Sequence, residues 1–276
     1  MGEDMKYQNF TYDDHISREF NITAHKKFFC GDTGIHFHEF FEIEIMTGGS
    51  GSCMVNGKEI KLERGNAYIL TPADFHYLKG EPKLELYNIM FDESLVDKKL
   101  ISALFNATEK RFFSFNEDEL KEISFFIDMI IKEIDGGQYN FKGAINNLLE
   151  LIITRIIRKL DGAKSDGESV SGIDYALRYV YAHLRENPSR EAVAKVCNYS
   201  PNYFSKLFYE YTGQKYVDFL NFLKVTRAKK LLALSNLTVN EIAFECGFTS
   251  ISNFYRVFKE SEGVSPLDYR GKYNEK

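Results

Sequence analysis

The chain has 276 residues, of which 44% are hydrophobic and 27% charged, and its formal net charge at pH 7 is −5. This composition indicates an ordinary globular protein that is long enough for two domains. No apolar run approaches the roughly 20 residues of a membrane helix, and the polar start MGEDMKYQNF does not resemble a signal peptide. The four cysteines form no CxxC pair, which argues against a disulfide framework. We therefore expect a cytoplasmic location and no membrane partner.

The stretch up to about Phe91 predicts short β-strands. In residues 41–45, FEIEI, hydrophobic residues alternate with glutamates, the pattern of a half-buried strand. Asn56-Gly57 is a favoured two-residue hairpin turn between the strand-like segments CMV and KEIKL. Several such strands at short intervals predict a small β-barrel or sandwich.

Two helices are expected between residues 116 and 160. NEDEL, residues 116–120, places a capping Asn before three acidic residues, which is typical of a helix start. The second helix carries an apolar stripe from Ile145 to Leu160. Such a stripe packs either within the chain or against its copy in a second subunit, and the pattern leaves both open. We expect helices 116–160 to mediate a homodimer.

Residues 161–172, DGAKSDGESVSG, are polar and lack apolar periodicity, which predicts a flexible linker between domains 1–160 and 173–276. From Gly172 to the end there are 15 Lys/Arg against 11 Asp/Glu, whereas the preceding residues carry 20 against 29. This asymmetry indicates that the C-terminal part meets a polyanion, although chance variation in surface charge would also produce it.

The C-terminal part states one pattern twice, in CNYSPNYFSKLFYEYTG from Cys197 and CGFTSISNFYRVFKESEG from Cys246. Each copy follows a short helical segment and ends in a glycine, so each predicts a helix-turn-helix unit. Between the copies, residues 216–234 predict a helix that carries Lys224, Arg227, Lys229 and Lys230. Its length of roughly 28 Å is of the order of one DNA turn, so the two second helices are expected to enter successive major grooves.

The outward faces of the two second helices carry polar and basic side chains. Arg and Lys can reach guanine edges, Asn can pair with adenine, and Ser or Tyr can hold phosphates. A polar face can also be merely solvated, but two copies with a basic residue at the same offset favour DNA contact. The candidate DNA-binding residues are Asn202, Tyr203, Ser205, Lys206, Ser252, Asn253 and Arg256.

From about Ile173 to Tyr273 the sequence resembles the AraC family of bacterial transcription regulators. The resemblance is carried by SPNYFSKLFYEYTG, RAKKLL, VNEIAFECGF and FYRVFKESEGVSPLDYR, in that order. It implies two helix-turn-helix subdomains joined by a helix. It also implies base contacts from three residues of each second helix: Asn202, Ser205 and Lys206, and Ser252, Asn253 and Arg256. Phe222 stands where relatives commonly carry Arg, so a phosphate contact at that position is not implied.

The N-terminal segments HFHEFFEIEIMTGG and GNAYILTPADFHYL resemble the cupin barrel, which is commonly the sensing domain of the same family. In metal-binding cupins the matching positions hold a divalent metal with three imidazoles and a carboxylate. Those positions are His36, His38, Glu42 and His76. Three interpretations stay open: an effector pocket at the barrel mouth, a structural cluster, or a metal site.

The second cupin segment departs from the pattern. Gly65 is one residue too far from Pro72, Asp74 stands in place of the expected glycine, and Gly80 stands in place of the expected Asn. We therefore expect these residues to line an effector pocket without a bound metal.

Together these observations predict an α+β protein of two domains. An N-terminal cupin-like β-barrel with following helices precedes a C-terminal all-α tandem helix-turn-helix domain. The expected function is sequence-specific binding of double-stranded promoter DNA, controlled by a small-molecule effector such as a sugar, with RNA polymerase as a further candidate partner. No catalytic residues, cofactor or metal are expected, because no phosphate loop, nucleophile elbow or HExxH occurs. The rival hypothesis is a metal-dependent cupin enzyme with an appended helical domain.

Overall fold

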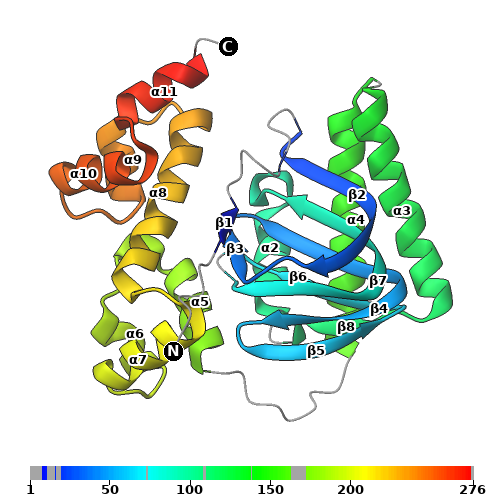
Figure 1. Cartoon of the computed structure of the whole chain (residues 1–276). Helices are drawn as coiled ribbons and strands as arrows, with labels where there is room; N and C mark the ends of the chain where they lie inside the picture. Colours follow the sequence, from blue (N-terminus) through cyan, green and yellow to red (C-terminus); the bar gives the residue numbers. More distant parts are fainter. Residues whose placement is uncertain are drawn as a thin grey trace. The chain divides into compact units, whose positions relative to one another are not determined.

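The computed structural model describes residues 8–10, 16, 20–72, 74–107, 110–137, 139–162 and 172–274. The chain divides into two compact units, residues 1–169 and 170–276. The first contains a β-sheet and helices, and the second contains helices (Figure 1). The predicted α+β class is confirmed. The linker at 161–172 stays a prediction, because its residues 163–171 lie outside the described part of the chain.

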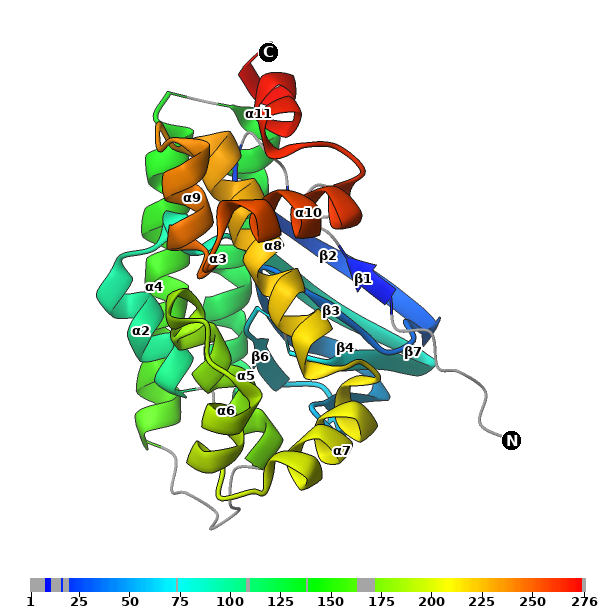
Figure 2. The same cartoon turned by 90° about the vertical axis from the view of Figure 1, so that its left-hand side faces the viewer.

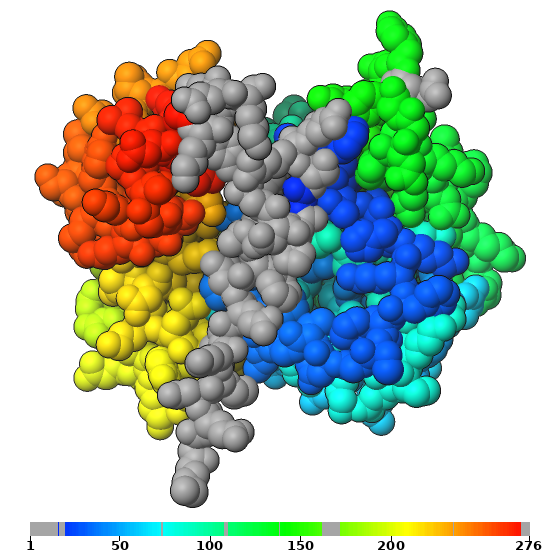
Figure 3. Space-filling view, turned by 45° about the horizontal axis from the view of Figure 1, so that its top comes forward, coloured from blue at the N-terminus to red at the C-terminus, as the bar shows by residue number. Residues whose placement is uncertain are grey.

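The described residues of the first unit form an eight-stranded sheet in the order β1-β3-β7-β4-β6-β8, with β2 paired to β7 and β5 to β4. The pairs are antiparallel except for β1 with β3. Strand β2 lies at the surface of this unit, in blue in Figure 3. The strands are β1 Gln8–Phe10, β2 Ile22–Asp32, β3 His36–His38, β4 Phe41–Val55, β5 Lys58–Glu63, β6 Asn66–Leu70, β7 His76–Phe91 and β8 Phe112–Ser114.

Strands β4 and β7 pair along most of their length and form the centre of the sheet. Their register shifts near Gly48 and again near Gly51, and such bulges bend a strand. Gly49, between them, has φ +76°, and a Cβ there would lie 2.0 Å from the Lys83 carbonyl oxygen, so no larger residue fits. The predicted hairpin turn is confirmed, with Asn56 and Gly57 both at positive φ between β4 and β5.

The alternating segment 41–45 is buried on both faces, so the expectation of a half-buried strand is wrong. Ile43 and Ile45 pack against the helices of this unit. Glu42 and Glu44 point to the other face, yet they are only 6% and 4% exposed. That face is enclosed because the sheet also packs on itself there, through a second buried cluster that includes Met46, Leu70 and Leu86.

The helical segments of the described residues that follow or interrupt the sheet are η1 Glu93–Leu95, α2 Lys98–Ala107, α3 Glu117–Gly136 and α4 Phe141–Gly162. The predicted cap of α3 is confirmed, since Asn116 and Glu119 form a reciprocal capping box. The apolar stripe of α4 lies in the same core cluster as α3 and the sheet. The stripe itself is therefore not free to be a dimer interface, and dimerisation through helices 116–160 stays a prediction.

The second unit contains two helix-turn-helix pairs, α6 with α7 and α9 with α10, connected by α8 (Figures 1 and 2). Ser200 and Ser250 cap the starts of α7 and α10. Gly213 and Gly263 end these helices, as predicted, and both have the left-handed conformation. None of the described helices is both long and apolar enough to cross a membrane. The helices are α5 Gly172–Ala182, η3 Leu184–Glu186, α6 Arg190–Val196, α7 Pro201–Thr212, α8 Tyr216–Leu234, α9 Val239–Glu245, α10 Ile251–Glu262 and α11 Pro266–Asn274.

The burial of the α4 stripe generates a stability prediction. Ile153 is fully buried, whereas Leu151 on the same helix is 37% exposed. Ile153→Lys should destabilise the first unit by more than about 3 kcal/mol, because it buries a charge without a partner. Leu151→Lys is the matched control and should leave thermal unfolding, followed by circular dichroism, nearly unchanged. A folded, soluble Ile153→Lys protein with a normal melting curve would contradict the packing described here.

Candidate functional site

The predicted DNA-binding residues lie on the outward faces of α7 and α10. The opposite faces hold Phe204 and Phe208 in α7 and Phe254 and Phe258 in α10, all fully buried. Ser205 and Asn253 are half-buried, and the other predicted residues are exposed, namely Asn202, Tyr203, Lys206, Ser252 and Arg256. The structure thus places these side chains where a partner can reach them.

The two basic residues at the matched offset have different surroundings. The Nη1 of Arg256 donates to both carboxylate oxygens of Glu260, at 2.9 and 2.8 Å, and its Nη2 donates to Asn253 Oδ1 at 2.9 Å. Lys206 has a looser pair, with its Nζ 3.7 Å from Glu210 Oε1. Because both pairs are exposed, they are weak and exchangeable for a DNA group. The guanidinium is held in an oriented position, whereas the ammonium is not.

Helix α8 presents its basic residues unevenly. Arg227 is exposed, but Lys224 is only 4% exposed, and Lys229 pairs with Glu262 at 3.2 Å. The sequence pattern treats these residues alike, because their different burial depends on the packing of segments distant in the sequence. Lys224 is therefore not a surface contact for DNA.

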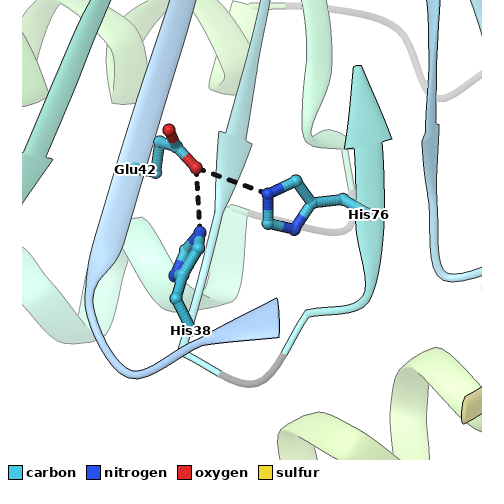
Figure 4. A group of neighbouring side chains, drawn as sticks. All are labelled: His38, Glu42 and His76. Atoms are coloured by element: carbon cyan, nitrogen blue, oxygen red, sulfur yellow. Dashed lines mark hydrogen bonds and ion pairs between the residues drawn. The ribbon is translucent and has the colours of Figure 1, made fainter. Parts of the chain in front are cut away.

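The four N-terminal site residues predicted from the sequence come together inside the first unit. His38 of β3 and His76 of β7 direct Nε2 at the same carboxylate oxygen of Glu42 in β4, at 2.8 and 3.5 Å (Figure 4). His36 lies beside them, with its ring centroid 4.0 Å from that of His76. All four side chains are buried. The cluster is thus enclosed in the sheet rather than open at its edge.

Backbone carbonyls fix the orientation of these imidazole rings. The Nδ1 of His38 lies 3.0 Å from the Phe40 carbonyl oxygen, and that of His76 lies 3.1 Å from the Asp74 carbonyl oxygen. A neutral ring has one N–H, so it can satisfy either its carbonyl or Glu42 but not both. Each ring therefore either donates from Nδ1 to its carbonyl and leaves an Nε2 lone pair facing Glu42, or donates from Nε2 to Glu42.

Burial and neighbouring groups shift the pKa values of the cluster in opposite directions. Burial and the neighbouring His76 lower the pKa of His36 to about 3. Burial also lowers the pKa of His38, although its contact with Glu42 acts in the opposite direction. Burial alone would raise the pKa of Glu42, but the facing histidines hold it well below the ordinary range. The Glu42 carboxylate is thus the charged group of the cluster, and burial favours the neutral form of the His36 and His38 rings beside it.

A second buried carboxylate extends this polar interior. Glu44 accepts hydrogen bonds from the Tyr68 hydroxyl and, at 2.8 Å, from Asn88 Nδ2, which also donates to Glu42. Burial and the charge of Glu42 raise the pKa of Glu44. Among the described residues, the Oδ1 of Asn88 has no hydrogen-bond partner. Glu44, Tyr68 and Asn88 are not among the predicted site residues, because the alternation in residues 41–45 predicts a solvent-facing Glu44.

Asp74, which replaces the glycine expected from the cupin pattern, holds the turn before β7. It accepts hydrogen bonds from Asn56 and from the backbone and hydroxyl of Thr71, and it forms a buried ion pair with Arg111 at 2.7 Å. Burial alone would raise the pKa of Asp74, but Arg111 lowers it. Since His76 is two residues away and contacts the Asp74 carbonyl, this network also positions the histidine cluster.

The residues present fit the divalent metal that the cupin resemblance implies. The ligand atoms of His38, Glu42 and His76 lie within 4.8 Å of one another. Two imidazoles and one carboxylate form a suitable donor set for iron, manganese or zinc. Rings whose Nδ1 is tied to a carbonyl present a free Nε2 lone pair, the form that binds metal. A bound metal would supply the positive charge that the lone pairs and Glu42 share.

Comparison with known proteins agrees with both units. The family described as "AraC-like ligand binding domain" matches residues 32–132, and the family described as "Helix-turn-helix domain" matches residues 193–272. Together they match more than half of the chain. The chain belongs to the AraC family. It is a DNA-binding transcription regulator with an N-terminal ligand-binding domain.

Relatives along most of the chain are transcriptional activators by name. RhaS of Escherichia fergusonii is 24% identical over 85% of this chain and 86% of its own length. RhaR of Mannheimia succiniciproducens is 23% identical over 95% of each protein. The regulatory protein PocR of Salmonella typhimurium is 39% identical over 100 residues, which are 36% of this chain and 33% of PocR.

Solved structures are similar to the chain in part or along most of its length. The DNA-binding domain of AdpA, solved with a target DNA, is 29% identical and covers 39% of this chain and 96% of that one, with a TM-score of 0.37. Fatty-acid-bound ToxT from Vibrio cholerae is 17% identical and covers 91% and 93%, with a TM-score of 0.41.

The Asp74–Arg111 pair generates a second prediction. Arg111→Met should destabilise the first unit by about 3–5 kcal/mol, because it leaves a buried carboxylate without its cation. The double variant Arg111→Met, Asp74→Asn should recover part of this loss in chemical denaturation. Arg64→Met, which removes an exposed pair with Glu117, is the control and should unfold like the wild type. Equal unfolding of Arg111→Met and the wild type would contradict the prediction.

Proposed function

We propose that this regulator reads operator DNA sequence-specifically through α7 and α10. The observation that carries the proposal is the matched outward display of seven polar and basic side chains on two helices whose inner faces are fixed by buried phenylalanines. The proposed contact residues are those predicted from the sequence: Asn202, Tyr203, Ser205, Lys206, Ser252, Asn253 and Arg256.

The two helices are proposed to contribute differently to recognition. The guanidinium of Arg256 is planar and held by Asn253, so it suits the paired O6 and N7 acceptors of guanine. The more mobile ammonium of Lys206 suits a phosphate. Specificity at one base position would then come from α10, and α7 would add affinity with less dependence on sequence.

The proposed effector is a small polar molecule of the sugar class that binds at the polar interior of the barrel. Sugar hydroxyls both donate and accept hydrogen bonds, and this interior offers carboxylates, imidazoles and the free acceptor of Asn88. The proposed pocket residues are His36, His38, Glu42 and His76. Effector binding there is proposed to alter operator affinity.

The remaining proposals concern partners and setting. We place the protein in the cytoplasm as a homodimer, joined through faces of α3 and α4 other than the buried stripe. Activation of transcription through RNA polymerase is proposed because the relatives RhaS and RhaR are named transcriptional activators. The regulator is proposed to have no catalytic residues and no resident cofactor.

One observation favours a second function. The convergence of His38, His76 and Glu42 fits a metal, as a metal-dependent cupin enzyme would require. Purified protein with one metal ion per chain, turnover of a substrate and no promoter affinity would establish this enzyme in place of the proposed sensor.

The division between the two helices is tested by binding isotherms on cognate and scrambled DNA at several salt concentrations. Arg256→Ala should cost about 1–3 kcal/mol on the cognate operator and relax the preference at one base position. Lys206→Ala should weaken binding to both DNAs alike and reduce the salt slope by about one unit. If Arg256→Ala loses equal affinity for both DNAs, base reading by α10 is wrong.

The effector proposal is tested by thermal unfolding with a panel of monosaccharides. A ligand at 100 times its Kd should stabilise the folded protein by about 2.7 kcal/mol and change operator affinity. Glu42→Gln should lose this response while still binding DNA, and Glu85→Gln, which alters a half-exposed glutamate of the same sheet, should keep it. A panel that shifts neither melting temperature nor operator affinity would contradict the sugar class.

A further inference from the structure

Lys224, near the middle of α8, is a buried ammonium whose neighbours are an amide and an aromatic ring. It is 4% exposed, and its Nζ donates a hydrogen bond to Asn187 Oδ1 at 2.6 Å. It also lies 5.0 Å from the ring centroid of Phe248. Within the described part of the chain it pairs with no carboxylate. Burial lowers its pKa to about 8.

The two neighbours of Lys224 belong to different helix-turn-helix units. Asn187 ends η3 in the left-handed conformation, three residues before the start of α6. Phe248 lies in the turn between α9 and α10, where its ring packs against Phe254 at 5.0 Å. The side chain of Lys224 therefore contacts both the segment that leads into the first helix-turn-helix unit and the turn of the second helix-turn-helix unit.

Two further contacts join the same segments. Gly247 lies so close to η3 that a Cβ on it would be 2.3 Å from the Leu184 carbonyl oxygen. Arg185 of η3 forms an ion pair with Glu245 at the end of α9, at 2.8 Å. The turn between α9 and α10 is thus packed directly on η3. The two helix-turn-helix units are connected by this contact as well as by α8.

A lysine at this position is unfavourable for stability alone. A buried charge loses its hydration, and an apolar side chain of similar length would fill the same space without that cost. Lysine does supply a directional hydrogen bond and a cation–π contact, which fix where Asn187 and Phe248 lie. Lys224 therefore contributes a defined position of Asn187 and Phe248 rather than stability.

We propose that Lys224 is a positioning residue that, through Asn187 and Phe248, locks the second helix-turn-helix unit onto η3 and so sets the spacing of α7 and α10 on DNA. This rests on the proposed reading of DNA by both helices. When one rigid protein binds two DNA segments at once, the linkage of its two helix-turn-helix units raises the overall affinity. This gain is lost when the spacing of the two units does not match the spacing of the two DNA segments.

The proposal is tested with Lys224→Met in the full chain. Its affinity is compared with that of the wild type on operator DNA with both segments, with either segment scrambled, and with one base pair inserted between the segments. Wild type should lose at least tenfold on the inserted DNA. Lys224→Met should bind intact operator about tenfold more weakly, bind each single-segment DNA like the wild type, and lose less on insertion.

Asn187→Gly is the second variant, because it removes the acceptor while keeping a residue that favours the left-handed backbone. It should reproduce the pattern of Lys224→Met, and it keeps the test decisive if Lys224→Met does not fold. Arg227→Met, on the exposed side of α8, is the control and should change affinity for all DNAs by the same factor.

Two results would overturn the proposal. In the first, both variants lose as much affinity on the inserted DNA as the wild type does. In the second, the variants lose equal affinity for intact and single-segment DNAs, which indicates a general loss of binding. Failure of the proposed function is distinguishable, because wild type would then bind intact and single-segment DNAs equally.

Discussion

Glu42, Asp74 and Lys224 are ionisable side chains that the fold buries, and each must find its partners inside the protein because water does not reach it. The contacts with these partners join segments that are distant in the sequence. Glu42 brings β3 and β7 to β4, Asp74 connects the hairpin turn to Arg111, and Lys224 connects η3 to the turn of the second helix-turn-helix unit. Hydrogen bonds are directional, so these contacts constrain the positions of the segments that they join more closely than apolar packing does.

Local signals explain how much could be predicted from the sequence. Asn116 before three acidic residues, the glycines after α7 and α10, and the Asn56-Gly57 turn act over a few residues, and each has the predicted conformation. The helix-turn-helix repeat was recognisable for the same reason, since its buried phenylalanines and closing glycines recur at fixed spacing. The histidine cluster was accessible only through the cupin resemblance, which supplied the pairing of strands that the spacing does not.

The errors arise where burial depends on distant pairing. Glu44 is buried because Tyr68 and Asn88, which lie 24 and 44 residues away, close the polar face of the sheet. Lys224 could not be separated from Arg227, because both are basic residues of one predicted helix without a clear apolar stripe. Asp74 was recognisable as a departure from the cupin pattern. Its role as the partner of Arg111 was not, because Arg111 lies 37 residues later in the chain. In each case the decisive partner has no local signal in the chain.

The two kinds of polar group in this protein are arranged for different tasks. Those that define geometry are buried and contact partners inside the protein, whereas Lys206, Asn202 and Ser252 are exposed. Arg256 is held by the exposed carboxylate of Glu260 and by Asn253. Surface side chains away from caps and buried networks change stability little when they are replaced. In the proposed mode of DNA reading, the sequence preference of the two helices can therefore vary through their outward residues while η3, α8 and the buried phenylalanines keep the spacing. Under that proposal, DNA specificity and the rigid spacing of the two helices are set by separate residues.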